Sequence, residues 1–369
     1  MKIGIVATHS FPIPSPTHTG DVVILDLAKS LDEMGHTVNL YAPEGTHCTS
    51  KGKVFPMRAS YGKYPPAGED CEQECFNNHA ESLRNEDIVH DFSVTKRIVQ
   101  SLYNECRKNI ISTIMGGAWM QSQQPHNLIV WSESHRDRVI RGATDYENTP
   151  TPNLAGINGN PVKEAHIVNG GIDTEYYCPT YEKKNFLLWM NRWHPVKGYS
   201  RAIEIARLCP DIEIVLAGEH PDREMFDYQK QCALEAVKLA EGLPNVKFEW
   251  LPADPHHHEA KRALYQQAKA LLYTIQFNEP FGLSQVEALA CGTPVIGTNY
   301  GSVPEVISDG VTGFVCENDV QKFIEAIRKI DNINPQTCRE HAVRRFDRRV
   351  MANSYLTQYN EVISGKGWS

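Results

Sequence analysis

The sequence predicts two successive α/β domains, each built around a parallel sheet with helices on its faces. The chain has 369 residues, which exceeds what one hydrophobic core usually organises, since domains cluster near ~100–150 residues. Its apolar share of 41% and charged share of 22% are those of an ordinary globular protein. Short apolar runs alternate with helical stretches along the chain, which is the pattern of β-α-β units.

The first half opens with an alternating apolar strand, Lys2–Ala7, followed by the turn-rich segment Ser10–Gly20. A helix comes next, because apolar residues from Ile24 to Leu31 recur at positions i, i+3, i+4 and i+7. Gly35 is typical of a left-handed cap and ends this helix. Six further strands are expected in this half: His36–Tyr41, Val54–Met57, Asp87–His90, Ile110–Ile114, Leu128–Trp131 and Ala165–Val168.

A second series of strands begins after the polar segment Cys178–Asn185, which we interpret as the linker between the domains. Helices such as Arg201–Leu208 and Glu259–Ala268 separate these strands. Six strands are expected here: Phe186–Met190, Ile212–Ala217, Val246–Leu251, Ala270–Thr274, Pro294–Gly297 and Gly313–Cys316.

Two Rossmann-like domains in tandem are therefore expected. In open α/β sheets, ligands bind beyond the carboxyl ends of the strands. Two such sheets facing each other would create a cleft suited to two substrates. Functional residues are therefore expected in loops that follow strands.

Composition and charge exclude several classes of protein. A formal net charge of −8 disfavours a nucleic-acid partner, because duplex binding needs a basic surface. Apolar runs such as Phe186–Met190 are far shorter than the ~20 residues of a membrane-spanning helix. Met1 and Lys2 lead straight into a strand, without the apolar core and cleavage site of a signal peptide. We expect a water-soluble, cytoplasmic protein with reduced cysteines.

Three other features have ordinary interpretations. Cys71 and Cys75 could share a helix face, but we expect them to act as small hydrophobes and not as metal ligands. Adjacent histidines in the run from His256 to His258 cannot all face one ion, so we expect a polar loop and no metal. The basic segment Lys51–Lys63 indicates a solvated loop, or alternatively a contact with an acceptor or a membrane surface.

The densest group of polar residues follows the expected strand Ala270–Thr274. Here Glu279 and Glu287 flank a loop in which Pro280 and Gly282 permit a tight turn at a helix N-terminus. Backbone amides at such an N-terminus favour phosphate and hydroxyl oxygens. The two carboxylates could point into one pocket, where one accepts ribose hydroxyls and the other contacts a transferred sugar.

Glu287 also has an alternative role. With Ser284 it fits the capping box Ser-x-x-Glu, which needs no ligand. Glu279 lies before the loop and has no such structural explanation.

A second group of polar residues follows the expected strand Phe186–Met190. Arg192 and Lys197 lie on the short loop before the next helix, where they could clamp the negative charge of a leaving nucleoside diphosphate without a metal. A solvated basic turn is the alternative.

Taken together, these motifs resemble the family 4 retaining glycosyltransferases of the two-domain GT-B architecture. The resemblance covers nearly the whole chain. Its motifs are Arg192 with Lys197 and Gly198, the Glu-x7-Glu element inside EPFGLSQVEALACGTPVI, the segment Gly301–Phe314, and His166–Asp173, which resembles the exit from the N-terminal domain.

The resemblance implies three parts: an acceptor-binding domain at residues 1–177, a nucleotide-sugar-binding domain at residues 178–350, and a closing helix in residues 351–369 that returns to the first domain. It places Arg192 and Lys197 on the donor diphosphate, Glu287 on the ribose and Glu279 near the reacting sugar carbon. Further donor contacts are implied for Gly20, Leu251, Phe281, Gly282, Leu283 and Ser284.

Two positions depart from the family pattern. The family usually has paired glycines in the first loop, whereas Asp21 follows Gly20 here. Many members have a histidine after the strand matching Ile110–Ile114, whereas this chain has Met115. His90 is a candidate for the acceptor side, although a strand-end histidine with satisfied hydrogen bonds is the alternative.

The function expected from the sequence is transfer of a sugar from a nucleotide-diphosphate sugar, with retention of configuration, to the hydroxyl of a sugar, lipid or small-molecule acceptor. No prosthetic group is expected. A sugar phosphorylase, a nucleotide-sugar epimerase and a non-catalytic sugar-nucleotide binding protein are the alternatives. A dinucleotide oxidoreductase is disfavoured, because the first strand is followed by Thr8-His9-Ser10 and not by Gly-x-Gly-x-x-Gly.

Overall fold

The computed structural model describes residues 1–14, 19–47, 51–60, 67–116, 125–141, 162–221, 227–252 and 257–368. The chain divides into two compact units. The first contains Met1–Gly171 together with Arg348–Ser369, and the second contains Ile172–Asp347. The chain therefore leaves the first unit a few residues before the expected boundary at 177, and it returns close to the expected boundary at 350.

The first unit contains a seven-stranded parallel sheet in the order β3-β2-β1-β4-β5-β6-β7. All seven strands expected for this half are confirmed, with ends shifted by at most two residues. They are β1 Lys2–Val6, β2 Thr37–Pro43, β3 Val54–Met57, β4 Ile88–Asp91, β5 Ile110–Thr113, β6 Leu128–Val130 and β7 His166–Ile167.

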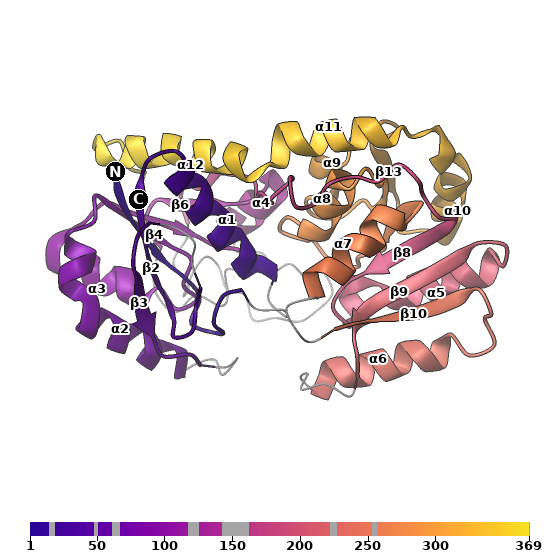
Figure 1. Cartoon of the computed structure of the whole chain (residues 1–369), viewed down its shortest axis with the longest axis horizontal. Helices are drawn as coiled ribbons and strands as arrows, with labels where there is room; N and C mark the ends of the chain where they lie inside the picture. Colours follow the sequence, from indigo (N-terminus) through magenta and orange to yellow (C-terminus); the bar gives the residue numbers. More distant parts are fainter. Residues whose placement is uncertain are drawn as a thin grey trace. The chain divides into compact units, whose positions relative to one another are not determined.

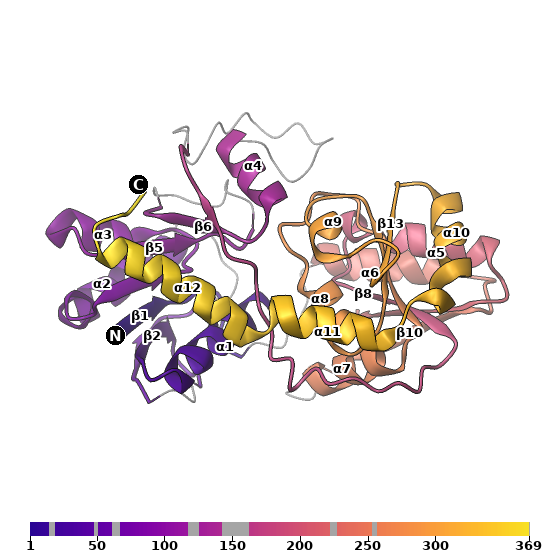
Figure 2. The same ribbon diagram turned by 90° about the horizontal axis from the view of Figure 1, so that it is seen from above.

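The last helix of the chain completes the first unit, where it lies beside α1 (Figure 2). Arg348 at its start is almost fully buried and donates two hydrogen bonds, of 2.7 and 2.9 Å, to the carboxylate of Glu33 in α1. This bidentate geometry fixes where the helix docks. The helices of this unit are α1 Thr19–Glu33, α2 Ala67–Arg84, α3 Arg97–Cys106, α4 Glu133–Arg141 and α12 Arg348–Ile363.

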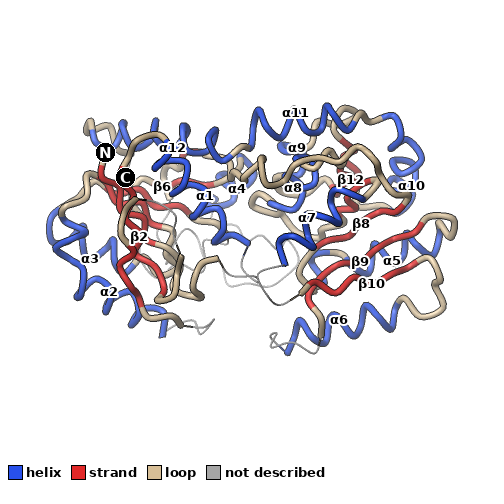
Figure 3. The backbone as a smooth tube through the Cα atoms, in the orientation of Figure 1, coloured by secondary structure: helices blue, strands red, loops and turns tan. Residues whose placement is uncertain are grey.

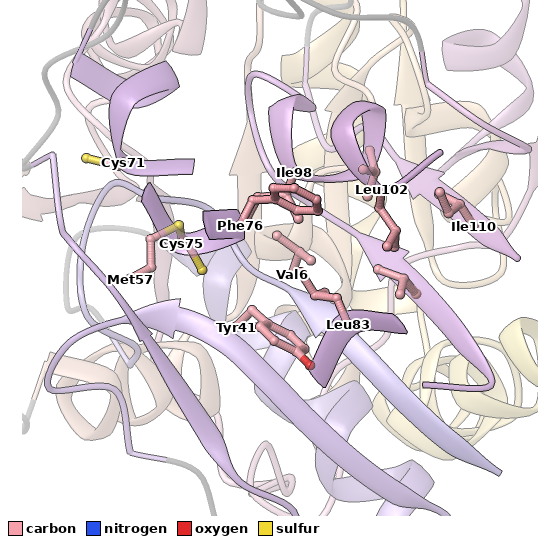
Figure 4. Packing of buried hydrophobic residues seen from close by; sticks show 12 residues of the cluster. Val6, Tyr41, Met57, Cys71, Cys75, Phe76, Leu83, Ile98, Leu102 and Ile110 are labelled. Carbon is pink, nitrogen blue, oxygen red and sulfur yellow. The ribbon is translucent and has the colours of Figure 1, made fainter. Parts of the chain in front are cut away.

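A hydrophobic core lies between the sheet and helices α2 and α3 (Figure 4). Cys71 and Cys75 on α2 are buried in it, together with Met57 and Phe76. Burial raises the pKa of the Cys75 thiol to about 12 and also raises the pKa of Cys71. Both cysteines are free thiols that fill apolar space, as expected.

The second unit contains a six-stranded parallel sheet in the order β10-β9-β8-β11-β12-β13, enclosed by helices (Figure 3). Renumbered from its first strand this is the order 3-2-1-4-5-6 of a Rossmann fold, whose connections reverse between β8 and β11. The six strands expected here are confirmed: β8 Phe186–Met190, β9 Glu213–Glu219, β10 Val246–Leu251, β11 Ala270–Tyr273, β12 Val295–Thr298 and β13 Gly313–Cys316.

The helices of the second unit follow its strands (Figure 1). Asp319 caps α10 and Asn334 caps α11, each by accepting a hydrogen bond from a backbone amide of the first turn. The helices are the 3-10 turn Pro195–Lys197, α5 Tyr199–Leu208, α6 Asp227–Leu239, α7 His257–Gln267, α8 Leu283–Ala290, α9 Val303–Val306, α10 Val320–Lys329, the 3-10 turn Ile330–Asn332 and α11 Pro335–Phe346. Within the ranges described above, no helix combines the length and apolar character needed to cross a membrane.

Candidate active site

Two loops of the second unit meet at the point where the strand order reverses. One follows β8 and the other follows β11. The hydroxyl of Thr274 donates a 2.8 Å hydrogen bond to the carbonyl of Gly198, and the amide of Gln276 donates to the carbonyl of Val196. Gly198 has a φ of 76°, and a β-carbon there would overlap the Thr274 carbonyl. Only glycine therefore allows the two loops to touch.

The carboxylate of Glu279 projects from the second loop and is held through one oxygen. Its Oε2 accepts hydrogen bonds from the Lys197 ammonium and from the Tyr273 hydroxyl, the latter at 3.0 Å. Among the residues that the structure describes, Oε1 has no hydrogen-bond donor. The side chains of Lys197 and Glu279 are 12% and 14% exposed. The pair is therefore oriented by the protein and still has one free acceptor oxygen.

Gly282 makes room for this arrangement. It has a φ of 79° and is the N-cap of α8, a conformation that side chains with a β-carbon rarely adopt. A β-carbon there would also lie 2.6 Å from the Tyr273 hydroxyl oxygen. Burial, and then the charge of Glu279, raise the pKa of Tyr273 well above its ordinary value, so the phenol stays protonated and donates.

The loop that carries Glu279 is supported by the segment after β12. The amide of Ser302 donates to the carbonyl of Glu279 at 3.0 Å, and the Ser302 hydroxyl donates to the carbonyl of Phe281 at 2.6 Å. Gly301, with a φ of 55°, packs so close that a β-carbon would overlap the Glu279 backbone. The close approach requires glycine at position 301, and the two hydrogen bonds are made by Ser302.

Glu287 lies in α8 and does not form a capping box. The helix begins at Leu283 with Gly282 as N-cap and has no side-chain cap, so Ser284 lies inside the first turn. The capping-box interpretation of Ser284 and Glu287 is therefore wrong, because the left-handed glycine starts the helix two residues earlier than the motif requires.

The Glu287 carboxylate is instead the acceptor in a buried cluster of three donors. Its Oε1 accepts from the Tyr177 hydroxyl at 3.0 Å and from Lys261 Nζ at 2.8 Å. Its Oε2 accepts from the Tyr265 hydroxyl at 3.1 Å and lies 2.6 Å from Lys261 Nζ. Burial, and then the charge of Glu287, raise the pKa of both tyrosines well above the ordinary value, so both phenols donate.

The sequence interpretation missed these donors. Lys261 and Tyr265 lie four positions apart on α7, a spacing that places them on one helix face. That spacing was the only local signal. Tyr177 comes from a distant segment that no pattern connects with α8.

Arg192 lies on the β8 loop with its side chain exposed. Its guanidinium makes no hydrogen bond or ion pair within the described ranges, in contrast to Lys197. Burial, and then the charges of Arg192 and Lys197, lower the pKa of His194 between them. Arg192 is therefore a fixed positive charge on this loop, and its guanidinium has no partner among the residues that the structure describes.

The other predicted donor-side residues occupy the same end of the sheet, with one exception. Leu251 is the last residue of β10, and Leu283 and Ser284 form the first turn of α8. Phe281 is buried against Phe346, with ring centroids 5.7 Å apart. The exception is Gly20, which belongs to the first unit and lies in the first turn of α1.

His90 is fully buried at the end of β4. The Tyr359 hydroxyl lies 2.7 Å from its Nδ1, and the Thr113 hydroxyl lies 2.8 Å from its Nε2. Burial, and then the charge of Lys96, lower the pKa of His90 well below its ordinary value. The histidine is therefore a neutral group with both ring nitrogens bonded inside the first unit.

No metal site is visible in the described ranges, where no group of three or more His, Cys, Asp or Glu side chains gathers. The run from His256 to His258 is only partly covered, because His256 and the side chain of His257 lie outside the described residues. Tyr61 and Lys63 of the basic segment also lie outside them, and Arg58 within it forms a 2.9 Å surface ion pair with Glu74.

Two Rossmann-like units in one chain are the architecture of the GT-B fold. Residues 179–343 match the family described as Glycosyl transferases group 1. The chain thus has a group 1 glycosyltransferase domain and is a glycosyltransferase.

One relative is similar over most of the chain. The putative glycosyltransferase YtcC of Bacillus subtilis is 26% identical over 315 residues, which cover 78% of this chain and 76% of that protein. For two further curated relatives, the match spans 50% of their own length.

Solved structures with low sequence identity share the fold. Sucrose-phosphate synthase from Thermosynechococcus elongatus superposes with a TM-score of 0.76 at 15% identity, covering 98% of this chain and 99% of that one. HepE from Anabaena, solved in complex with UDP and glucose, has a TM-score of 0.68 at 15% identity, covering 98% of this chain and 100% of that one.

Proposed function

We propose that this chain is a family 4 retaining glycosyltransferase that transfers a sugar from a nucleoside-diphosphate sugar to an acceptor hydroxyl. The observation that supports this most strongly is the Glu279 carboxylate, held by Lys197 and Tyr273 through Oε2 alone. A carboxylate at the carboxyl end of the strands, with one oxygen anchored and one free, suits a sugar hydroxyl near the reacting carbon.

In this proposal the donor diphosphate binds Arg192 and Lys197. Arg192 is exposed and makes no hydrogen bond or ion pair within the described ranges, and the Lys197 ammonium is held beside the Glu279 carboxylate. Charge develops on the diphosphate as the bond to the sugar breaks, and groups that meet this charge stabilise the transition state. Loss of one such group typically costs about 3–4 kcal/mol in activation free energy.

The proposed reaction needs no covalent enzyme intermediate. The bond between the anomeric carbon and the diphosphate oxygen breaks, and a bond to the acceptor oxygen forms on the same face of the sugar. The acceptor proton passes to the leaving diphosphate oxygen. In this scheme Glu279 positions the sugar through Oε1, and the positive charges of Arg192 and Lys197 replace those that a metal would supply.

The nucleotide would lie along the same edge of the second unit. Backbone groups near Leu251 would contact the base, and Glu287 would accept hydrogen bonds from the ribose. The first turn of α8 would meet sugar and phosphate oxygens; its residues are Phe281, Gly282, Leu283 and Ser284. Gly20 in α1 remains a proposed diphosphate contact of the first unit, which would bind the acceptor.

The donor class is supported by a structural relative. HepE was solved with UDP and glucose, and a nucleoside diphosphate linked to a hexose suits the proposed contacts.

A thermal-shift panel tests the donor assignment. Wild type and Arg192→Ala are heated with UDP, GDP, ADP and their hexose conjugates. We expect one nucleotide series to raise the melting temperature of wild type and to lose most of this effect in the variant. Since Arg192 is exposed, the variant should fold normally. No shift with any nucleotide would contradict the proposed donor class.

A further inference from the structure

The Glu287 carboxylate is surrounded by donors from three side chains. A carboxylate offers about four lone-pair positions, and four contacts from Tyr177, Lys261 and Tyr265 occupy them. A ribose hydroxyl that donates to Glu287 must therefore replace one of these donors. Two of the donors are neutral phenols, and the third is the ammonium group whose charge balances the buried carboxylate.

Lys261 is the donor that is hardest to replace. Its side chain and that of Glu287 are each 5% exposed, and its Nζ contacts both carboxylate oxygens. Separating a buried ion pair leaves an uncompensated charge, which is far more unfavourable than releasing a neutral hydroxyl. An incoming ribose hydroxyl should therefore displace a tyrosine hydroxyl and leave the ion pair intact.

Lys261 also has a donor to spare. An ammonium group carries three hydrogens; Glu287 Oε1 accepts one of them, and Oε2 lies 2.6 Å from Nζ in the same ion pair. No other hydrogen-bond acceptor for Nζ is found in the part of the chain that the structure describes. A hydroxyl group both donates and accepts, so a neighbouring ammonium and carboxylate satisfy it completely.

We propose that Lys261 is a ribose-binding residue, which forms with Glu287 a single donor–acceptor pair for the vicinal hydroxyls of the nucleotide. This inference rests on the proposed function, since it requires a nucleotide in the second unit. It adds a specificity role for Lys261, namely preference for a ribonucleotide over its 2′-deoxy counterpart.

Calorimetric titration with UDP, GDP and ADP and their 2′-deoxy counterparts tests this role. For the nucleotide that binds, we expect wild type to prefer the ribose form by about ten-fold or more, the size of a charge-assisted hydrogen bond. Lys261→Met keeps Glu287 as an acceptor for the ribose but removes the charged donor, so it should lower this ratio. A wild-type ratio that persists in Lys261→Met would overturn the proposal while leaving the proposed function intact.

Tyr265→Phe is the informative comparison on the same carboxylate. It removes one donor from Glu287 but keeps the Lys261 pair, and it opens a lone pair for the ribose. The ratio should therefore remain at the wild-type value or rise. Equal loss of the ratio in Tyr265→Phe and Lys261→Met would show that both residues only support Glu287 structurally, and would overturn the proposal.

Two further variants control for folding. Lys183 is a half-buried lysine of the second unit, where Nζ donates to the carbonyls of Gln266 and Cys291 and to the hydroxyl of Thr293. Lys183→Met should destabilise the fold and leave the ratio unchanged. If Lys261→Met does not fold, Lys261→Gln keeps one hydrogen bond to Glu287 and should still lower the ratio; an unchanged ratio would overturn the proposal.

Failure of the proposed function would give a different binding result. If wild type binds none of the six nucleotides, the proposed function and the ribose role are both overturned. If wild type binds and discriminates, only the responses of Lys261→Met and Lys261→Gln decide the role of Lys261.

Discussion

The hydroxyl of Tyr273 donates a 3.0 Å hydrogen bond to the same oxygen of Glu279 that Lys197 contacts. Both residues thus anchor one side of the carboxylate and leave the other side free. Tyr273 is buried at the end of β11, on the rigid sheet, whereas Glu279 lies on the loop that follows. The tyrosine therefore fixes a loop carboxylate to the sheet.

Tyr273→Phe should slow the reaction without weakening nucleotide binding. A hydrogen bond to a charged group contributes about 1.5–3 kcal/mol, which corresponds to a loss of roughly ten- to a hundred-fold in kcat. Steady-state measurement of sugar release from the donor gives the kcat of each variant. Tyr199→Phe is the matched control, because Tyr199 is also buried in this unit but bonds Glu235. Equal kcat for Tyr273→Phe and wild type would contradict the role of Tyr273.

Gly282→Ala should lose both stability and turnover. The left-handed φ of 79° disfavours alanine, and its β-carbon would lie 2.6 Å from the Tyr273 hydroxyl oxygen. Gly310 is a suitable control, since it has a φ of 71° and no atom within 4 Å of an added β-carbon. In urea titrations, Gly310→Ala should be destabilised by about 1 kcal/mol and Gly282→Ala by more. Equal losses would mean that the contact with Tyr273 does not constrain this position.

Asp21 should make stability depend on pH. It is 2% exposed, and within the described ranges its carboxylate accepts one hydrogen bond, the 3.0 Å bond that the Thr8 hydroxyl donates to Oδ1. Burial raises the pKa of Asp21 from 3.8 to about 6. Between these values the folded protein binds more protons than the unfolded chain. The stabilisation from protonated Asp21 is therefore complete below pH 3.8 and is lost as the pH rises through about 6.

Asp21→Asn removes this dependence. The variant should be more stable than wild type above pH 6 by about 1–3 kcal/mol, with the difference shrinking towards pH 4. Urea unfolding at several pH values measures it. A difference that does not change with pH would contradict the raised pKa of Asp21.

Much of the fold could be predicted from the sequence because its signals are local. Several expected strands, such as Phe186–Met190, are short apolar runs, and parallel sheets bury such runs. The loops around Lys197 and Glu279 could be located for the same reason, since each directly follows a strand.

The partners within the site could not be predicted, because they come from distant segments. Nothing local connects Tyr177 with Glu287, which are 110 positions apart. The capping-box error has a similar origin: Ser284 and Glu287 have the right spacing, but the backbone conformation of Gly282 starts the helix. The donor and acceptor assignments, the domain roles and the cytoplasmic location remain predictions.

The central claim is that Glu279 acts on the donor sugar while other residues hold the nucleotide. Glu279→Gln tests it most directly, because it keeps the size of the side chain and removes only its charge. With the nucleotide sugar identified by thermal shift, we expect the variant to bind the nucleoside diphosphate within about three-fold of wild type and to lose sugar transfer or release by about a hundred-fold or more. Near-normal turnover in a folded Glu279→Gln variant would contradict the claim.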